Sequence, residues 1–158
     1  MSLRRVRLPS DLPGQLWLGP MPGRFTSWGS FQQQAQGCEL SVVVCLTPRP
    51  EMQELSPEYH AAVAGGRLPF RWLQLPMRNF GVPDDPAGFR REVEALAQGV
   101  RQGDRVLLHC AAGIGRTGTV AACVLKALGL EANEAMQRVR DAGSNPQNAE
   151  QSGVVRWF

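Results

Sequence analysis

The chain has 158 residues, of which 43% are hydrophobic and 20% charged, and this composition fits a single domain over residues 1–158. The formal net charge is only +3 and the basic residues, almost all arginine, are scattered, which argues against a dedicated nucleic-acid surface. The local cluster of Arg4, Arg5 and Arg7 is predicted to be a solvated tail, and the prolines that soon follow it exclude a signal peptide or membrane span there.

The first half of the chain alternates short apolar runs with segments that favour helices. Residues 15–20 predict a short strand ended by Gly-Pro, and residues 30–36 predict a short helix. Residues 42–46 are apolar enough for a central strand that is buried on both faces of a sheet. Residues 56–64 predict a helix, and residues 70–75 a further strand.

The second half continues this alternation. Residues 86–102 have the spacing of an amphipathic helix, residues 105–108 form a short apolar run suited to a buried strand, and residues 117–128 and 131–142 predict two more helices. The alternation predicts an α/β fold with a mainly parallel central sheet flanked by helices. In such a fold a ligand binds at the C-terminal ends of the strands, which is where Cys110 falls.

The segment between the strand at 105–108 and the helix at 117–128 reads HCAAGIGRTG and contains a Cys-x5-Arg spacing. Its glycines allow successive backbone N–H groups to point into one concavity at a helix N-terminus, where a tetrahedral dianion binds. The predicted phosphate-binding residues are Ala111, Ala112, Gly113, Ile114, Gly115 and Arg116.

Three side chains of this segment carry the predicted chemistry. Cys110 is the nucleophile, because the surrounding amides and the helix dipole favour a thiolate. The hydroxyl of Thr117 is positioned in sequence to donate to the sulfur, and Arg116 offers two parallel N–H groups to two phosphoryl oxygens. Together these groups predict phosphoryl transfer through a phosphocysteine.

With His109 before the cysteine and Thr-Gly after the arginine, the segment resembles the phosphate loop of the cysteine-dependent protein tyrosine and dual-specificity phosphatase superfamily. The length is nearer the small dual-specificity type. The resemblance implies a protein phosphatase that hydrolyses phosphotyrosine, or phosphoserine and phosphothreonine as well, in phosphoproteins or phosphopeptides. His109 is interpreted as a structural hydrogen-bonding residue rather than a base.

The resemblance extends upstream to Asn79-Phe80-Gly81-Val82-Pro83-Asp84, which looks like the mobile loop that supplies the general acid in tyrosine phosphatases. In that pattern an aspartic acid stands immediately before Phe-Gly-Val-Pro, whereas this chain has Asn79 there, by nature or by engineering. An amide has no proton to give, so a factor of roughly 10²–10⁴ from acid catalysis would be missing and aryl phosphates would be preferred. Either Asp84 or Asp85 acts as the acid instead, or both only cap the helix that begins near residue 86.

Downstream, residues 147–151 are similar to the family's glutamine loop. The spacing gives Gln147 the role of positioning the water that hydrolyses the phosphocysteine and gives Gln151 a supporting role. Two surface glutamines at the start of a helix would have the same pattern.

Two other functions stay open at this point. One is a phosphate-recognition module with little turnover, which the asparagine at position 79 suggests. The other is hydrolysis of an inositide or another non-protein phosphoester. The loop carries no lysine, which disfavours an inositide, but Arg49, Arg71 or Arg78 could line the rim. The oligomeric state cannot be read from the sequence.

The four cysteines show no paired metal-ligand spacing, so we expect no metal and no other cofactor. Cys38, Cys45 and Cys123 lie in or beside apolar runs and are expected to pack in the core, unless one serves as a resolving thiol for oxidised Cys110. A chain that relies on a thiolate needs a reducing compartment, and we therefore expect the cytoplasm.

Overall fold

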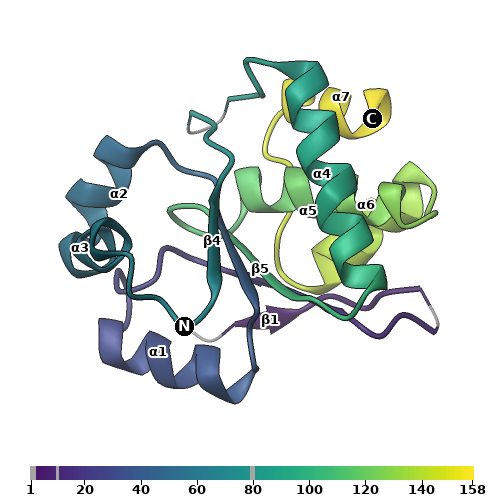
Figure 1. Ribbon diagram of the computed structural model, residues 1–158. Helices are drawn as coiled ribbons and strands as arrows, with labels where there is room; N and C mark the ends of the chain where they lie inside the picture. Colours follow the sequence, from purple (N-terminus) through teal and green to yellow (C-terminus); the bar gives the residue numbers. More distant parts are fainter. Residues whose placement is uncertain (1–2, 10, 79–80) are drawn as a thin grey trace.

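A computed structural model describes residues 3–9, 11–78 and 81–158 of the chain (Figure 1). A five-stranded sheet lies at its centre, in the order β1-β2-β5-β3-β4. The strands are β1 (Arg4–Arg5), β2 (Gln15–Gly19), β3 (Val42–Cys45), β4 (Arg71–Gln74) and β5 (Arg105–His109). All neighbouring strands are parallel except β1 and β2, which are antiparallel. The predicted α/β fold with a mainly parallel sheet is thus confirmed.

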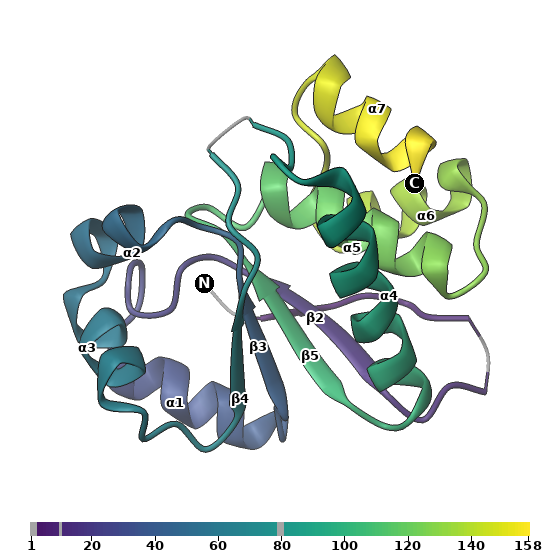
Figure 2. The same ribbon diagram turned by 45° about the horizontal axis from the view of Figure 1, so that its top comes forward.

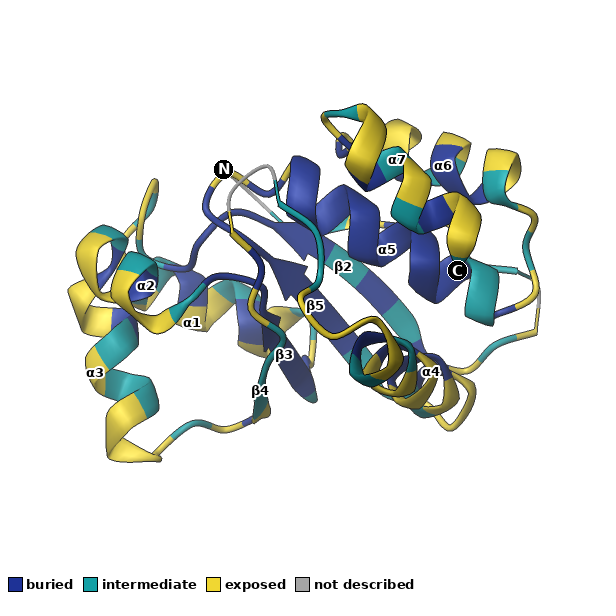
Figure 3. Cartoon of the chain, turned by 90° about the horizontal axis from the view of Figure 1, so that it is seen from above, coloured by how far each residue is buried: buried dark blue, intermediate teal, exposed yellow. Residues whose placement is uncertain are grey.

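Within the part of the chain that the structure describes, seven helices cover the two sides of this sheet. Figures 1 and 2 place α1 (Trp28–Gly37), α2 (Arg49–Leu55) and α3 (Pro57–Gly65) on one side. The other side carries α4 (Pro86–Arg101), α5 (Gly115–Ala127), α6 (Ala132–Asp141) and α7 (Ala149–Trp157). Helix α5 lies in the middle of the second group, and its residues 115–125 are all buried, as the dark blue of Figure 3 shows.

The core follows from alternation along the two innermost strands. Val42 and Val44 of β3 pack with α4–α7, whereas Val43 faces the opposite side and packs with α1. In β5, Leu108 belongs to the first of these clusters and Leu107 to the second. Both strands are therefore buried on both faces, as the apolar runs predict.

Several predicted elements agree with the structure to within a few residues, among them all four strands from residue 15 onward and the helices at α1, α3, α4, α5 and α6. Three elements were not predicted. The strand β1 is only two residues long, α2 follows directly after Pro48, and α7 has a weakly amphipathic sequence.

The prediction that the Arg4 cluster is a solvated tail is wrong for Arg4. Arg4 pairs with Leu18 of β2, and its guanidinium donates to the carbonyls of Gly113 and Ala142, both at 2.6 Å. Arg5 and Arg7 are exposed, as expected. A charge cluster in a short segment cannot by itself indicate that one of its members reaches acceptors more than one hundred residues away.

The cysteines predicted to be structural are free thiols. Cys45 and Cys123 are buried, and Cys38 is half-buried. Burial raises the pKa of the Cys123 thiol to about 12 and also raises the pKa of Cys45. Within the described residues, no helix has the length and apolar composition of a membrane span.

Candidate active site

Cys110 lies at the C-terminal end of β5, where the chain turns into α5. Its side chain is buried, and its sulfur accepts hydrogen bonds from the Gly113 amide at 3.2 Å and from the Thr117 hydroxyl at 3.0 Å. Gly113 has a φ of 76°, a left-handed conformation that favours glycine. A Cβ at this position would lie 2.5 Å from the Gly19 carbonyl oxygen. The turn that brings the amide to the sulfur therefore depends on this glycine.

The other backbone amides of the turn are available to a ligand. Among the described residues, none accepts a hydrogen bond from the amides of Ala111, Ala112, Ile114, Gly115 and Arg116. Gly115 and Arg116 begin α5, and the first amides of a helix have no intrahelical partner. These donors lie on the turn that leads from the buried sulfur of Cys110 into the N-terminus of α5, an arrangement that suits a dianion.

The side chain of Arg116 is only 1% exposed, and its guanidinium donates to two partners, Glu51 and Met77. Its Nη1 donates to Glu51 Oε1 at 3.1 Å and to the Met77 carbonyl at 3.0 Å, and its Nη2 donates to Glu51 Oε2 at 2.7 Å. Glu51 comes from α2 and Met77 from the segment after β4. A bidentate carboxylate fixes the plane of the guanidinium more strictly than a single contact would.

This pairing leaves one edge of the Arg116 guanidinium without a partner among the described residues. A guanidinium has about five N–H donors, and those directed at Glu51 and Met77 are the two on Nη1 and one on Nη2. The remaining Nη2–H and the Nε–H share one edge, and Nε is buried with no hydrogen-bond partner in the described structure. Two parallel donors on one edge match two oxygens of a phosphoryl group.

Glu51 was not identified from the sequence, although a signal for it exists. It lies in the first turn of the helix that follows β3, and β3 is the neighbour of β5. Residues that follow adjacent parallel strands converge at the same edge of the sheet. A carboxylate there is a natural partner for the arginine of the turn after β5.

His109 is fully buried beneath the turn. Its Nε2 lies 2.8 Å from the hydroxyl of Tyr59, which also accepts from Trp72 Nε1 at 2.8 Å, and its Nδ1 lies 3.2 Å from the Cys110 carbonyl. A carbonyl only accepts, so Nδ1 carries the proton and the Tyr59 hydroxyl donates to Nε2. Burial lowers the pKa of His109 to about 4, which keeps the imidazole neutral at pH 7. The geometry agrees with a structural role.

The predicted acid loop is described only in part, because Asn79 and Phe80 lie outside the described residues. Its first anchor is Met77, whose amide donates to the Leu46 carbonyl at 2.9 Å. Asp85 caps α4 by accepting from the Gly88 amide at 3.1 Å, which agrees with the helix-cap alternative for this residue. Asp84 is exposed and has no hydrogen bond or ion pair with any described residue.

The two glutamines occupy different environments. Gln147 is exposed. A Cβ added to Gly115 would collide with the side-chain oxygen of Gln147, so the carboxamide lies against the turn. Gln151 is fully buried; its side-chain oxygen accepts from the Gln147 amide at 2.8 Å and its Nε2 donates to the Gly81 carbonyl at 3.2 Å. Gln151 thus connects the start of α7 to the predicted acid loop.

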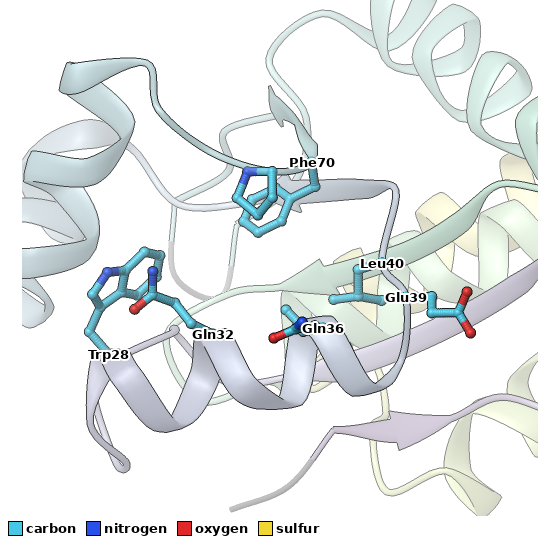
Figure 4. A pocket seen from close by; sticks show the side chains of 8 residues that line it. Trp28, Gln32, Gln36, Glu39, Leu40 and Phe70 are labelled. Carbon is cyan, nitrogen blue, oxygen red and sulfur yellow. The ribbon is translucent and has the colours of Figure 1, made fainter.

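A cavity of about 500 Å³ lies elsewhere, along α1. In Figure 4 Trp28, Gln32 and Gln36 project from this helix on one side, and Phe70 stands on the other. Because none of its lining residues belongs to the turn at Cys110, we do not assign it to the site. The described residues contain no cluster of three or more His, Cys, Asp and Glu side chains that could hold a metal ion.

The chain is similar in sequence to known phosphatases. The profile of the family PTP-SAK, described as Swiss Army Knife protein, DSP-PTPase phosphatase domain, matches residues 24–154. The putative tyrosine phosphatase 067L of Invertebrate iridescent virus 3 is 30% identical over 107 residues, which cover 65% of this chain and 40% of the viral protein. Tyrosine-protein phosphatase 1 of Caenorhabditis elegans is 45% identical over 56 residues, which cover 34% of this chain and 5% of the nematode protein.

Among solved structures, kinase associated phosphatase with its catalytic-site cysteine replaced by serine superposes with a TM-score of 0.85. The sequence identity is 20%, and the superposition covers 100% of this chain and 93% of that chain. At this identity the likeness concerns the fold alone.

The family match spans most of the chain, and the chain therefore belongs to the DSP-PTPase phosphatase domain family. This confirms the resemblance to the cysteine-dependent tyrosine and dual-specificity phosphatases. The aligned segments cover only 40% and 5% of the two curated relatives, so the relatives contain much that this chain does not match.

Proposed function

We propose that the chain hydrolyses aryl phosphate monoesters, phosphotyrosine in phosphoproteins or phosphopeptides above all, through a phosphocysteine on Cys110. The carrying observation is that the seven-residue turn from Cys110 to Arg116 combines a sulfur that already accepts two hydrogen bonds with donors that have no partner among the described residues. These donors are the other amides of the turn and the Nε–Nη2 edge of Arg116.

In the first step the Cys110 thiolate attacks phosphorus, the S–P bond forms and the bond to the aryl oxygen breaks. The turn amides and the Arg116 edge bind the phosphoryl oxygens, whose charge they stabilise in the transition state. The Gly113 amide and the Thr117 hydroxyl donate hydrogen bonds to the sulfur and so orient it for the attack. The bidentate contact with Glu51 holds Arg116 in place, so little reorganisation is needed.

In the second step water attacks the phosphocysteine and the S–P bond breaks, which gives inorganic phosphate and returns the thiolate. The same amide and hydroxyl stabilise the departing sulfur anion. We assign the positioning of the water to Gln147, since its carboxamide lies against Gly115, and the support of that residue to Gln151, whose side chain accepts from the Gln147 amide.

The leaving oxygen determines the substrate preference. With asparagine at position 79, the departing group receives no proton from that side chain, which penalises an alkoxide far more than a phenolate of pKa about 10. Asp84 is the alternative acid. Its side chain is exposed and has no hydrogen bond or ion pair with a described residue that would hold it elsewhere. We therefore expect phosphotyrosine to be hydrolysed faster than phosphoserine or phosphothreonine.

Apolar surface beside the turn supports an aromatic substrate. Ile114 of the turn is 38% exposed and Phe25 is 50% exposed. Arg24 joins Phe25 to the turn, because its guanidinium lies 4.6 Å from the Phe25 ring centroid and donates to the Ala111 carbonyl at 3.0 Å. The side chains of Ala111 and Ala112 add no cation for a second phosphate, which disfavours an inositide.

The chemistry proposed requires no cofactor, and a thiolate nucleophile works in a reducing compartment such as the cytoplasm. The competing proposal, a phosphate-recognition module, shares every feature of the site except turnover.

A steady-state assay with 4-nitrophenyl phosphate separates the two. We expect turnover that Cys110→Ser abolishes and that Cys38→Ser, a matched change at a half-buried cysteine outside the turn, leaves intact. Binding of a phosphotyrosine peptide without any turnover by the wild-type chain refutes the enzymatic proposal and favours the recognition module.

A further inference from the structure

The Arg4 guanidinium lies behind the phosphate-binding turn, although the sequence predicts a solvated side chain. Arg4 Nη2 donates to the Gly113 carbonyl at 2.6 Å, and Arg4 Nη1 donates to the Ala142 carbonyl at 2.6 Å and to the Ser144 hydroxyl at 3.0 Å. The Ser144 hydroxyl in turn donates to the Gly113 carbonyl at 2.6 Å. One carbonyl oxygen of the turn is therefore held by two donors, which occupy both of its lone pairs.

The orientation of that carbonyl determines where the next amide points. A trans peptide is planar, so its C=O and N–H groups point in opposite directions. Because Arg4 and Ser144 hold the Gly113 oxygen on their side, the Ile114 N–H points away from them. No described residue accepts a hydrogen bond from that N–H. Rotation of this peptide would turn the amide away and present a carbonyl oxygen to a phosphoryl dianion.

We propose that Arg4 is a positioning residue for the phosphate-binding turn, which fixes the peptide between Gly113 and Ile114 so that the Ile114 amide binds a phosphoryl oxygen. This inference rests on the proposed function, since it assigns an upstream residue to the same site. Arg4 touches no reacting atom; it acts through the backbone of Gly113.

Two further observations support the role of Arg4. The arginine is desolvated for these contacts: burial lowers the pKa of its guanidinium, and the nearby charge of Cys110 opposes that shift. In addition, Gly143 has a φ of 88° and a Cβ there would lie 2.6 Å from Arg4 Nη1. The loop between α6 and α7 is thus shaped around the arginine.

The test compares oxyanion binding and turnover in Arg4→Met, Arg4→Lys and Ser144→Ala, with tungstate as the probe of the turn. Loss of one well-placed oxyanion donor costs about 10²–10³-fold in catalysis, and a peptide still held by Ser144 loses only part of that. We expect Arg4→Met to weaken tungstate binding about 10-fold and to lower kcat/KM for 4-nitrophenyl phosphate by a similar factor. Arg4→Lys should recover part of both effects, because it keeps one cationic donor.

The double variant Arg4→Met with Ser144→Ala gives a sharper result. Each single change leaves one donor on the Gly113 oxygen, whereas the double variant removes both. The decrease in kcat/KM should therefore exceed the product of the two single decreases and reach about 10³-fold. Arg5→Met, an exposed neighbour in β1, is the matched charge control. Val6→Ala destabilises the same segment without a contact to Gly113, and it should lower Tm while tungstate affinity and KM stay at the wild-type value.

The outcomes separate this inference from the proposed function. Tungstate affinity and kcat/KM of Arg4→Met within twofold of wild type overturn the positioning role, whatever happens to Tm. If the wild-type chain binds tungstate without turnover, the enzymatic proposal fails, and the effect of Arg4→Met on binding still decides for or against Arg4. A wild-type chain that binds no tungstate overturns both.

Discussion

Substitution of Glu51 by alanine removes the carboxylate that holds both terminal nitrogens of Arg116, at 2.7 and 3.1 Å. The guanidinium stays buried, with a side-chain exposure of 1%, and keeps only the Met77 carbonyl as a described partner. The variant therefore leaves a cation that is neither solvated nor paired, and it frees the guanidinium plane to rotate.

The cost in stability follows from this burial. Breaking a fully buried ion pair by removal of one partner costs about 3–5 kcal/mol. The Glu51 side chain is 26% exposed, so water reaches its place in part and the cost is reduced. We expect a loss of about 2 kcal/mol, which corresponds to a decrease in Tm of roughly 4–8 °C for a domain of this size.

The decrease in kcat/KM of Glu51→Ala should be larger than a loss of stability of about 2 kcal/mol would cause in a chain that is still folded. If the proposed function is right, Glu51 positions the Nε–Nη2 edge of Arg116 against the phosphoryl group, and kcat/KM for an aryl phosphate should decrease about 100-fold in Glu51→Ala. Glu51→Gln retains one acceptor and should lose about 10-fold. Glu54→Ala, an exposed glutamate of the same helix, is the matched control and should behave as wild type. Wild-type kcat/KM in Glu51→Ala at a temperature where the variant is folded refutes the positioning argument.

Three further predictions concern the acid, the buried histidine and the glycine of the turn. Asn79→Asp should raise kcat for phosphoserine peptides by about 10²-fold or more and create a decline in rate on the basic side of the pH profile; an unchanged rate and profile would mean that another residue, such as Asp84, supplies the proton. The pKa of His109 is lowered from 6.5 to about 4, so the unfolded chain binds a proton at a higher pH than the folded chain does. The free energy of unfolding should therefore decrease by about 3 kcal/mol as the pH falls from 6.5 to 4. In urea titrations His109→Gln should lack this decrease, and an identical pH dependence of stability in both proteins would contradict the prediction. Gly113→Ala forces a left-handed φ on a residue whose Cβ meets the Gly19 carbonyl at 2.5 Å, and we expect Tm to decrease and tungstate binding to be lost, whereas unchanged binding would refute the role of this turn.

The sequence predicts the fold and the phosphate-binding turn because both are encoded locally. Strands β3 and β5 are continuous apolar runs, and helices α3, α4, α5 and α6 show helical spacing or clear boundaries. The turn holds its nucleophile, its amides and its arginine within seven consecutive residues. Their chemistry can therefore be predicted from the sequence without the tertiary structure. The preferences for glycine at residues 113, 115 and 118 do depend on distant contacts, with Gly19, Gln147 and Asn145 respectively.

The supporting residues are distant in sequence and could not be predicted in the same way. Glu51 reaches Arg116 across 65 positions, Tyr59 reaches His109 across 50, and Arg4 reaches Gly113 across 109. Each is an ordinary residue in its own segment, and its role arises only when the sheet brings the ends of separate strands together. A topological argument would have found Glu51, since β3 and β5 are neighbours; the two-residue strand β1 offers no periodicity from which to place Arg4.

The central claim is that Cys110 carries the phosphoryl group during turnover. Rapid acid quench of the wild-type chain with a saturating aryl phosphate, followed by mass spectrometry of its peptides, tests this directly. We predict one phosphoryl group per chain on Cys110 during the steady state, and no labelling and no turnover in Cys110→Ser. Turnover in Cys110→Ser, or sustained wild-type turnover with Cys110 never phosphorylated, would contradict the account.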